Sequence, residues 1–179
     1  MNITSYICAF FFSFCSPEKD KVVFDFEYSS PYEFARGVVY CTVSYNAMLS
    51  PEDRIPWKLS LAQASLESAW GESRFAREGN NLYGIRAVDE DSFMIPRDNP
   101  SVKVKKYLTL CNSVMDYMDL LNKHNAYEKF RDLRYRHLVL QTVDIEEVVY
   151  SLTEYSRDPN YFVKILDIMA YIDEQNWKF

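Results

Sequence analysis

Apolar residues in this 179-residue chain follow a helical period on both sides of one interruption, between Tyr83 and Leu108. Positions spaced by three and four place an apolar stripe on one side of a helix, so the period predicts helices wherever it holds. Inside the interruption, two short apolar runs flank a turn, which is typical of a hairpin. The pattern predicts helices over residues 31–48, 57–69, 73–77, 112–123, 126–135, 145–155 and 159–175, and strands over 93–95 and 102–107.

Local signals favour the same mainly helical organisation. Ser30, Pro31 and Glu33 supply a capping serine, a proline at the first helical position and an acid in the first turn. Gly71 is placed to end the second helix. The chain holds only four glycines, which disfavours a β fold interrupted by many turns. Residues 21–28 alternate, and they predict either a short strand or an extended arm laid on the domain.

Size and charge limit the class of protein. A chain of this length can bury one core, and a composition of 48% hydrophobic and 26% charged residues is ordinary for a globular protein. The net charge of −6 argues against a nucleic-acid partner. The cysteines and histidines show no zinc-ligand spacing, so we expect no metal and no cofactor. Free buried thiols are the default for the cysteines, and a Cys41–Cys111 disulfide is the alternative.

An apolar run near the start of the chain, residues 7–15 (ICAFFFSFC), is similar to the core of a signal peptide. No Lys or Arg precedes it, no small-x-small cleavage motif follows it, and the run is too short to cross a bilayer. We therefore expect no stable membrane span. Two interpretations stay open: an export signal over residues 1–16, or a segment packed on the domain.

Glu67 is the residue whose surroundings most favour acid catalysis. It lies near the end of a predicted helix made otherwise of Leu, Ala and Ser, and Trp70 and Phe75 flank it. The negative end of the helix dipole and the loss of water both raise the pKa of a carboxyl group. A raised pKa keeps a proton available near neutral pH, as a general acid requires. The alternative is an ordinary exposed glutamate on a polar helix face.

The stretch around Glu67 resembles the signature of glucosaminidase-type peptidoglycan hydrolases. Residues 61–86 read LAQASLESAWGESRFAREGNNLYGIR. That family has an AQ-x-x-x-ES-x-WG-x-S helix that carries the acid, followed by an NNL-aromatic-GI segment. The residues that match are Ala62, Gln63, Glu67, Ser68, Trp70, Gly71, Ser73, Asn80, Asn81, Leu82, Tyr83, Gly84 and Ile85.

Downstream segments narrow the resemblance to the Bax-type branch of this family. Residues 113–131 (SVMDYMDLLNKHNAYEKFR) are similar to its SV-x-x-Y…LN-x-H-x-AY run, and residues 155–161 (YSRDPNY) are similar to its YATDP-x-Y element. The resemblance covers residues 55–172. We therefore divide the chain into an N-terminal segment with the first helix, residues 1–50, and a catalytic domain, residues 51–179.

The resemblance implies a lysozyme-like α+β fold, mainly helical, with a small β lobe and a substrate groove. Glu67 would protonate the glycosidic oxygen, and Tyr155 would lie in the groove beside it. A purely packing role for Tyr155, and a turn-stabilising role for Asn80 and Asn81, are the alternatives. The further candidates for substrate binding are Ser68, Trp70, Asn80, Asn81, Tyr83 and Tyr161.

A second carboxylate is expected at the entry to the β lobe, where Asp89, Glu90 and Asp91 follow one another. Glycosidases commonly use two acids, but three consecutive acids also suit a solvated turn. Without a second acid, the 2-acetamido group of the substrate or the 6-hydroxyl of muramic acid would attack the anomeric carbon.

The function that the resemblance implies is cleavage of the β-1,4 glycan strand of peptidoglycan by an N-acetylglucosaminidase acting in the periplasm or cell envelope. Three alternatives stay open. The chain could be a lytic transglycosylase, a muramidase of phage origin (an endolysin or a virion-associated enzyme with a virion or envelope partner), or a glycan-binding module without activity.

Overall fold

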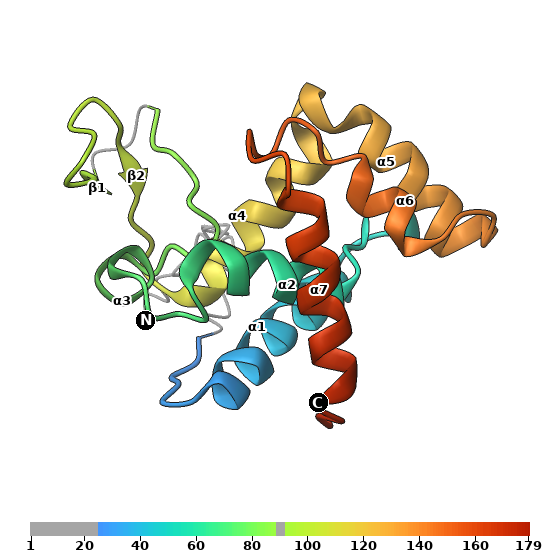
Figure 1. Ribbon diagram of the computed structural model, residues 1–179, viewed down its shortest axis with the longest axis horizontal. Helices are drawn as coiled ribbons and strands as arrows, with labels where there is room; N and C mark the ends of the chain where they lie inside the picture. The colour runs from blue at the N-terminus through green and yellow to red at the C-terminus, as the bar shows by residue number, and fades with distance from the viewer. Residues whose placement is uncertain (1–24, 89–91) are drawn as a thin grey trace, which may run out of the picture.

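The computed structural model describes residues 25–88 and 92–179, and Figure 1 shows their arrangement. Residues 1–16, for which two interpretations stay open, and the acids 89–91 lie outside this described part. In chain order the elements are α1 (Pro31–Asn46), η1 (Pro51–Asp53), α2 (Trp57–Ser68), α3 (Arg74–Gly79), β1 (Phe93–Met94), β2 (Val104–Lys105), α4 (Leu110–Lys123), η2 (Asn125–Tyr127), α5 (Glu128–Tyr135), η3 (Arg136–Leu140), α6 (Ile145–Tyr150) and α7 (Tyr161–Glu174).

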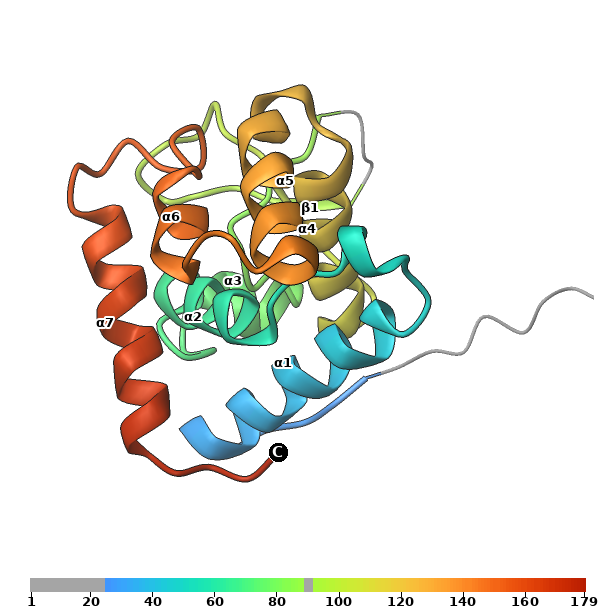
Figure 2. The ribbon, with the colours of Figure 1, turned by 90° about the vertical axis from the view of Figure 1, so that its right-hand side faces the viewer.

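The central helix is α2, against which α1 and α7 pack (Figure 2). The sequence predicted a single apolar face, but residues all around α2 are buried, including the polar Ser60, Gln63 and Ser65. Neighbours on several sides leave α2 little solvent-exposed face. Side chains of the last turn reach the surface, and Glu67 is one of them.

The buried polar residues of α2 are bonded to neighbouring elements. The Ser60 hydroxyl lies 2.9 Å from the Thr42 hydroxyl of α1 and 2.9 Å from the Tyr83 hydroxyl. Thr42 donates in turn to the carbonyl of Val38. Buried hydroxyls need such partners, so the three hydroxyls connect α1, α2 and the segment after α3.

The small β lobe stands at the opposite end of the molecule from α5 and α6 (Figure 1). Its strands β1 and β2 pair antiparallel, with Phe93 opposite Lys105, and Arg86 forms an additional bridge with Val104. The lobe rests on α3 at Gly79, where an added Cβ would lie 2.5 Å from the Met94 sulfur. The predicted α+β fold, mainly helical with a small β lobe, is confirmed.

Several element ends differ from the predicted ones. The helix predicted over 145–155 ends at Tyr150, and the last helix begins at Tyr161 instead of residue 159. The chain leaves α6 early because it turns at Leu152, whose carbonyl accepts from the Tyr155 amide, and so directs Tyr155 back toward the centre of the molecule. The π-helical turn η3 was not predicted at all.

The N-terminal arm, residues 25–28, is extended but belongs to no strand. Phe26 packs on Gly37 of α1, where a Cβ would meet its ring at 2.0 Å. The Tyr28 hydroxyl donates to the Gly71 carbonyl at 2.7 Å, and the Leu110 amide donates to the Asp25 carboxylate at 3.1 Å. The arm therefore lies on the domain, one of the two arrangements that the alternation predicted.

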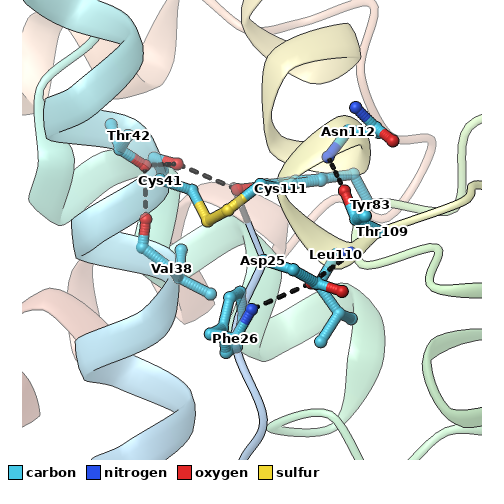
Figure 3. The surroundings of a disulfide bond; sticks show 11 residues. Asp25, Phe26, Val38, Cys41, Thr42, Tyr83, Thr109, Leu110, Cys111 and Asn112 are labelled. Carbon is cyan, nitrogen blue, oxygen red and sulfur yellow. Dashed lines mark hydrogen bonds between the residues drawn. A yellow bond between two sulfur atoms is a disulfide. The ribbon is translucent and has the colours of Figure 1, made fainter. Parts of the chain in front are cut away.

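Cys41 of α1 and Cys111 of α4 form a disulfide whose Cα atoms lie 5.3 Å apart (Figure 3). Both residues are buried. The expectation of free thiols is wrong for this pair, because packing of α1 against α4 brings together two cysteines 70 positions apart. Among the described residues, no helix is both long and apolar enough to cross a membrane.

Candidate active site

Glu67 lies in the last turn of α2, where the chain then turns sharply. Ala69, Trp70 and Gly71 all have positive φ, so the helix ends in left-handed conformation two residues earlier than the glycine predicted. Across from Glu67, Gly84 also has a positive φ of 67°, and an added Cβ there would lie 3.8 Å from Glu67 Oε2. The segment that follows Tyr83 therefore passes directly beside the carboxyl group.

The pKa of Glu67 is raised above that of an ordinary glutamate. Glu67 is exposed, but protein atoms gathered around its carboxyl group displace water and disfavour the charged form. The hydroxyl of Tyr161 interacts with the carboxylate and works in the opposite direction. The first effect is the larger one, so Glu67 holds its proton to higher pH than a fully solvated glutamate.

Five tyrosine rings form a connected cluster, and two of them, Tyr155 and Tyr161, interact with Glu67. Tyr155 stacks on Tyr161 with a centroid distance of 5.8 Å, and Tyr83 stacks on Tyr117 at 3.9 Å. Tyr127 lies beside Tyr155, with their ring centroids 6.3 Å apart. Burial raises the pKa of Tyr155 and Tyr161, so both hydroxyls stay protonated across the physiological pH range.

Gln63 orients this tyrosine cluster from one turn before Glu67 on α2. Its amide nitrogen donates to the Tyr161 hydroxyl at 2.8 Å, and its carbonyl oxygen accepts from the Tyr117 hydroxyl. The side chain is fully buried. Because the Tyr161 oxygen accepts from Gln63, its own proton is left to point toward Glu67.

A pocket of about 630 Å³ opens between the segment after Tyr83 and the connection from α6 to α7. Gly84 lines it, which places the pocket next to the Glu67 carboxyl group. We call this the main pocket; its lining residues are Tyr83, Gly84, Ile85, Arg86, Leu120, Tyr127, Thr153, Glu154, Tyr155, Ser156 and Arg157.

Two of the residues assigned to substrate binding, Tyr83 and Tyr161, lie at this site with Tyr155. The Tyr155 hydroxyl donates to the Tyr83 carbonyl at 3.2 Å, a contact that joins positions 72 apart in sequence. Both Tyr83 and Tyr161 are almost fully buried, at 3% and 2% exposure. Tyr83 lines the main pocket and Tyr161 stacks on Tyr155, and both rings leave little surface for a sugar.

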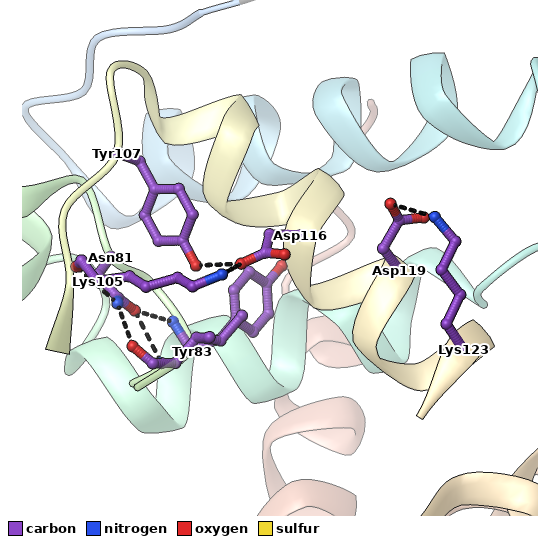
Figure 4. Close-up of polar contacts among 8 residues, drawn as sticks. Asn81, Tyr83, Lys105, Tyr107, Asp116, Asp119 and Lys123 are labelled. Atoms are coloured by element: carbon purple, nitrogen blue, oxygen red, sulfur yellow. Dashed lines mark hydrogen bonds and ion pairs between the residues drawn. The ribbon is translucent and has the colours of Figure 1, made fainter. Parts of the chain in front are cut away.

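The side chains of Asn80 and Asn81 form hydrogen bonds with backbone groups. Asn81 donates to the carbonyls of Ile85 and Lys105 at 3.0 Å each, and its oxygen accepts from the Ile85 amide (Figure 4). Asn80 adopts the left-handed conformation that ends α3 and donates to the carbonyl of Tyr107. Both residues join the segment after α3 to the backbone of residues 105–108.

Ser68 and Trp70 are not brought to the main pocket. Ser68 is buried, where its hydroxyl donates to the Ala64 carbonyl and accepts from the Gly71 amide. Trp70 points to the other side of α2, where its ring meets those of Phe34, Tyr171 and Trp177. The reason is the left-handed turn after Ser68, which reverses the chain and sends the indole toward α7.

The main pocket also holds charged residues that sequence reasoning missed: Arg86, Glu154 and Arg157. Arg86 is the last residue of the motif stretch, and Glu154 and Arg157 lie within two residues of Tyr155. Their closeness in sequence to predicted site residues was the signal that could have identified them. Asp89, Glu90 and Asp91 lie outside the described residues. Among the residues that are described, no group of three His, Cys, Asp or Glu side chains is arranged to hold a metal.

Solved structures with the same fold include the glycoside hydrolase domain of FlgJ and the catalytic domain of the autolysin Auto. The glycoside hydrolase domain of Salmonella typhimurium FlgJ superposes with a TM-score of 0.60 at 21% identity, over 82% of this chain and 91% of that domain. The catalytic domain of the Listeria monocytogenes autolysin Auto also gives 0.60, at 17% identity, over 82% of this chain and 87% of that one. These similarities confirm the lysozyme-like glucosaminidase fold.

Sequence relatives agree with the fold. The Escherichia coli (strain K12) Protein bax is 31% identical over 137 residues, which cover 74% of this chain and 48% of that protein. The exo-glucosaminidase LytG of Bacillus subtilis (strain 168) is 29% identical over 126 residues, 64% of this chain and 43% of LytG. The chain thus spans less than half the length of either relative.

A family model for glucosaminidases matches residues 44–174, which include every residue of the main pocket and Glu67. The chain therefore belongs to the mannosyl-glycoprotein endo-beta-N-acetylglucosaminidase family.

Proposed function

We propose that this chain is a peptidoglycan hydrolase that cleaves the β-1,4-linked glycan strand as an N-acetylglucosaminidase, with Glu67 as its general acid. The observation that carries the proposal is a carboxyl group with a raised pKa beside a polar pocket. Such a group can still hold a proton when the glycosidic oxygen needs one. The relatives named exo-glucosaminidase and peptidoglycan hydrolase supply the substrate class.

The reaction begins with proton transfer from Glu67 to the bridging glycosidic oxygen. The bond from that oxygen to the anomeric carbon breaks, the leaving sugar departs as an alcohol, and positive charge develops on the anomeric carbon and ring oxygen. Water then adds to the anomeric carbon and gives up a proton. Tyr155 and Tyr161 hold the Glu67 side of the pocket in place, and both stay neutral throughout.

The second step has several routes. A carboxylate can receive the proton from water, and Glu154 is a described carboxylate that lines the main pocket. The acids 89–91 are the sequence-based candidates for the same task. The 2-acetamido group of the substrate can instead attack the anomeric carbon, and attack by the muramic 6-hydroxyl would give the anhydro product of a lytic transglycosylase.

Mass spectrometry of fragments released from purified peptidoglycan tests the proposal, with Glu67→Gln as the control variant. Reducing-end N-acetylglucosamine is expected from the wild type only. Reducing or anhydro N-acetylmuramic acid would instead assign a muramidase or a transglycosylase, such as a phage lysin. Absence of fragments from a folded wild-type protein would contradict enzymatic activity and favour a glycan-binding module. A substrate of this kind implies action in the cell envelope.

A further inference from the structure

Two arginines of the main pocket, Arg86 and Arg157, have no ionic partner within residues 25–88 and 92–179. Both side chains are exposed, and within those ranges neither guanidinium group takes part in an ion pair or a hydrogen bond. The two guanidinium groups are therefore available to a ligand.

Lysines in a neighbouring depression differ from the two arginines in having carboxylate partners. A second depression of about 460 Å³ adjoins the main pocket and shares Ile85, Arg86 and Leu120 with it. Its lysines are engaged: Lys105 lies 3.0 Å from the Asp116 carboxylate, and Lys123 lies 2.7 Å from that of Asp119 (Figure 4). In the described part of these two depressions, the lysines are thus paired with carboxylates and the two arginines are not.

The chemistry of the free groups indicates the kind of ligand. A guanidinium group presents donors in a planar fork that matches a carboxylate, and such charge-assisted hydrogen bonds are stronger than neutral ones. Within residues 25–88 and 92–179, Glu154 is the acid that lines the same pocket, so in that part of the chain its charge offsets one of the two arginines. A carboxylate-bearing ligand would restore the balance.

In a peptidoglycan strand, carboxylates occur on one side of each disaccharide. N-acetylglucosamine is neutral, whereas the lactyl group of muramic acid is a carboxylate when bare and carries an acidic peptide when substituted. We propose that Arg86 and Arg157 form a carboxylate-recognition subsite for the muramyl side of the strand. The subsite makes the enzyme selective for peptidoglycan over neutral polymers of N-acetylglucosamine, an inference that rests on the proposed function.

Three substrates test this inference: peptide-bearing glycan strands, strands stripped of peptide by an amidase, and neutral chito-oligosaccharides of equal length. Arg86→Gln and Arg157→Gln are each compared with Arg36→Gln, an exposed arginine on α1 outside the main pocket. We expect KM for an anionic strand to rise about fivefold in each pocket variant, with kcat nearly unchanged. The Arg36 variant and the neutral substrate should show no change.

The pattern of losses identifies the source of the carboxylate. A loss confined to peptide-bearing strands assigns the stem peptide, and a loss that includes stripped strands assigns the lactyl group. Equal losses on neutral and anionic substrates, or no loss on either anionic strand, would overturn the subsite.

Binding measurements separate this inference from the proposed function. In a Glu67→Gln background, the dissociation constant of each strand is measured by calorimetry with and without the arginine substitutions. Weaker binding of anionic strands after Arg→Gln supports the subsite even if the wild type cleaves nothing, and unchanged binding contradicts it. Glu154→Gln should have the opposite effect and lower the dissociation constant of anionic strands, because it removes a negative charge that repels them. The effect of each arginine substitution on the dissociation constant of anionic strands should shrink as salt concentration rises.

Discussion

Glu67 differs from an ordinary surface glutamate in what surrounds its carboxyl group. Gly84 passes close to one oxygen, and the stacked rings of Tyr155 and Tyr161 lie beside it. Desolvation raises its pKa, so the folded protein favours the protonated form. Catalysis and stability should both respond to this one group.

Replacing Glu67 by Gln is expected to lower kcat by about two to four orders of magnitude, the usual contribution of a general acid. The fold should persist, because the residue is exposed at the end of α2. Release of soluble fragments from peptidoglycan measures activity, and circular dichroism measures folding. Activity within tenfold of the wild type would rule out the general-acid role.

The same substitution should change how stability depends on pH. A carboxyl group whose folded-state pKa is raised stabilises the protein below the unfolded-state pKa, and that stability is lost as pH rises through the folded-state value. As pH rises above the ordinary glutamate pKa of about 4.3, the wild type should therefore lose stability relative to Glu67→Gln. Thermal melts of both proteins across this range test the sign. A difference in melting temperature, wild type minus Glu67→Gln, that stays constant or grows as pH rises would contradict it.

Tyr161→Phe should move the alkaline limit of activity. The Tyr161 hydroxyl favours ionised Glu67, so its removal raises the pKa of the acid further. Glu67 then stays protonated to higher pH, and the alkaline limb of kcat/KM should shift upward. A pH–rate profile of wild type and variant measures the shift, with Tyr171→Phe, remote from the pocket, as the control. A shift of the alkaline limb to lower pH would contradict a stabilising contact between the Tyr161 hydroxyl and ionised Glu67.

At the scale of elements, α2 combines the core and the site in one helix. Gln63 belongs to both, since its buried amide forms hydrogen bonds with the hydroxyls of Tyr117 of α4 and Tyr161 of α7. Gln63→Leu would leave both hydroxyls without these partners in the core. We expect a loss of about 2 kcal/mol in the free energy of unfolding, measured by urea titration. A cost below about 0.5 kcal/mol would mean that the hydroxyls find other partners.

The turn after Tyr83 depends on a glycine at position 84. A Cβ there would meet Glu67 only at an ordinary contact distance, so the obstacle is the backbone, with φ of 67°. Gly84→Ala should therefore cost about 1 kcal/mol of stability. Calorimetry measures the cost, and an unchanged melting temperature would show that the turn relaxes freely.

The whole molecule is cross-linked by the Cys41–Cys111 disulfide, which closes a long loop between α1 and α4. In the chain-entropy account, a loop of this length contributes about 4 kcal/mol. The double variant Cys41→Ala/Cys111→Ala should lose most of that stability, and a reductant should have little further effect on it. Urea unfolding with and without dithiothreitol tests this, and equal stability of wild type and variant would contradict it.

Local sequence was enough to predict the helices, the small β lobe and the place of Glu67 near a helix end. Those features depend on periodicity, caps and motif residues that lie within a turn or two of each other. The ends of α6 and α7 were missed because contacts from distant parts of the chain decide them. Tyr155, for example, is bonded to the carbonyl of Tyr83.

What the tertiary structure alone decided is which side chains meet. Trp70 packs against Trp177, although its motif position suggested the groove, and Cys41 finds Cys111 instead of staying free. Arg86 and Arg157 share one pocket although 71 positions separate them. An aromatic ring, a thiol or a guanidinium group has the same sequence signature in a core, a bridge or a binding site. Only the packing of distant segments gives each group its partner.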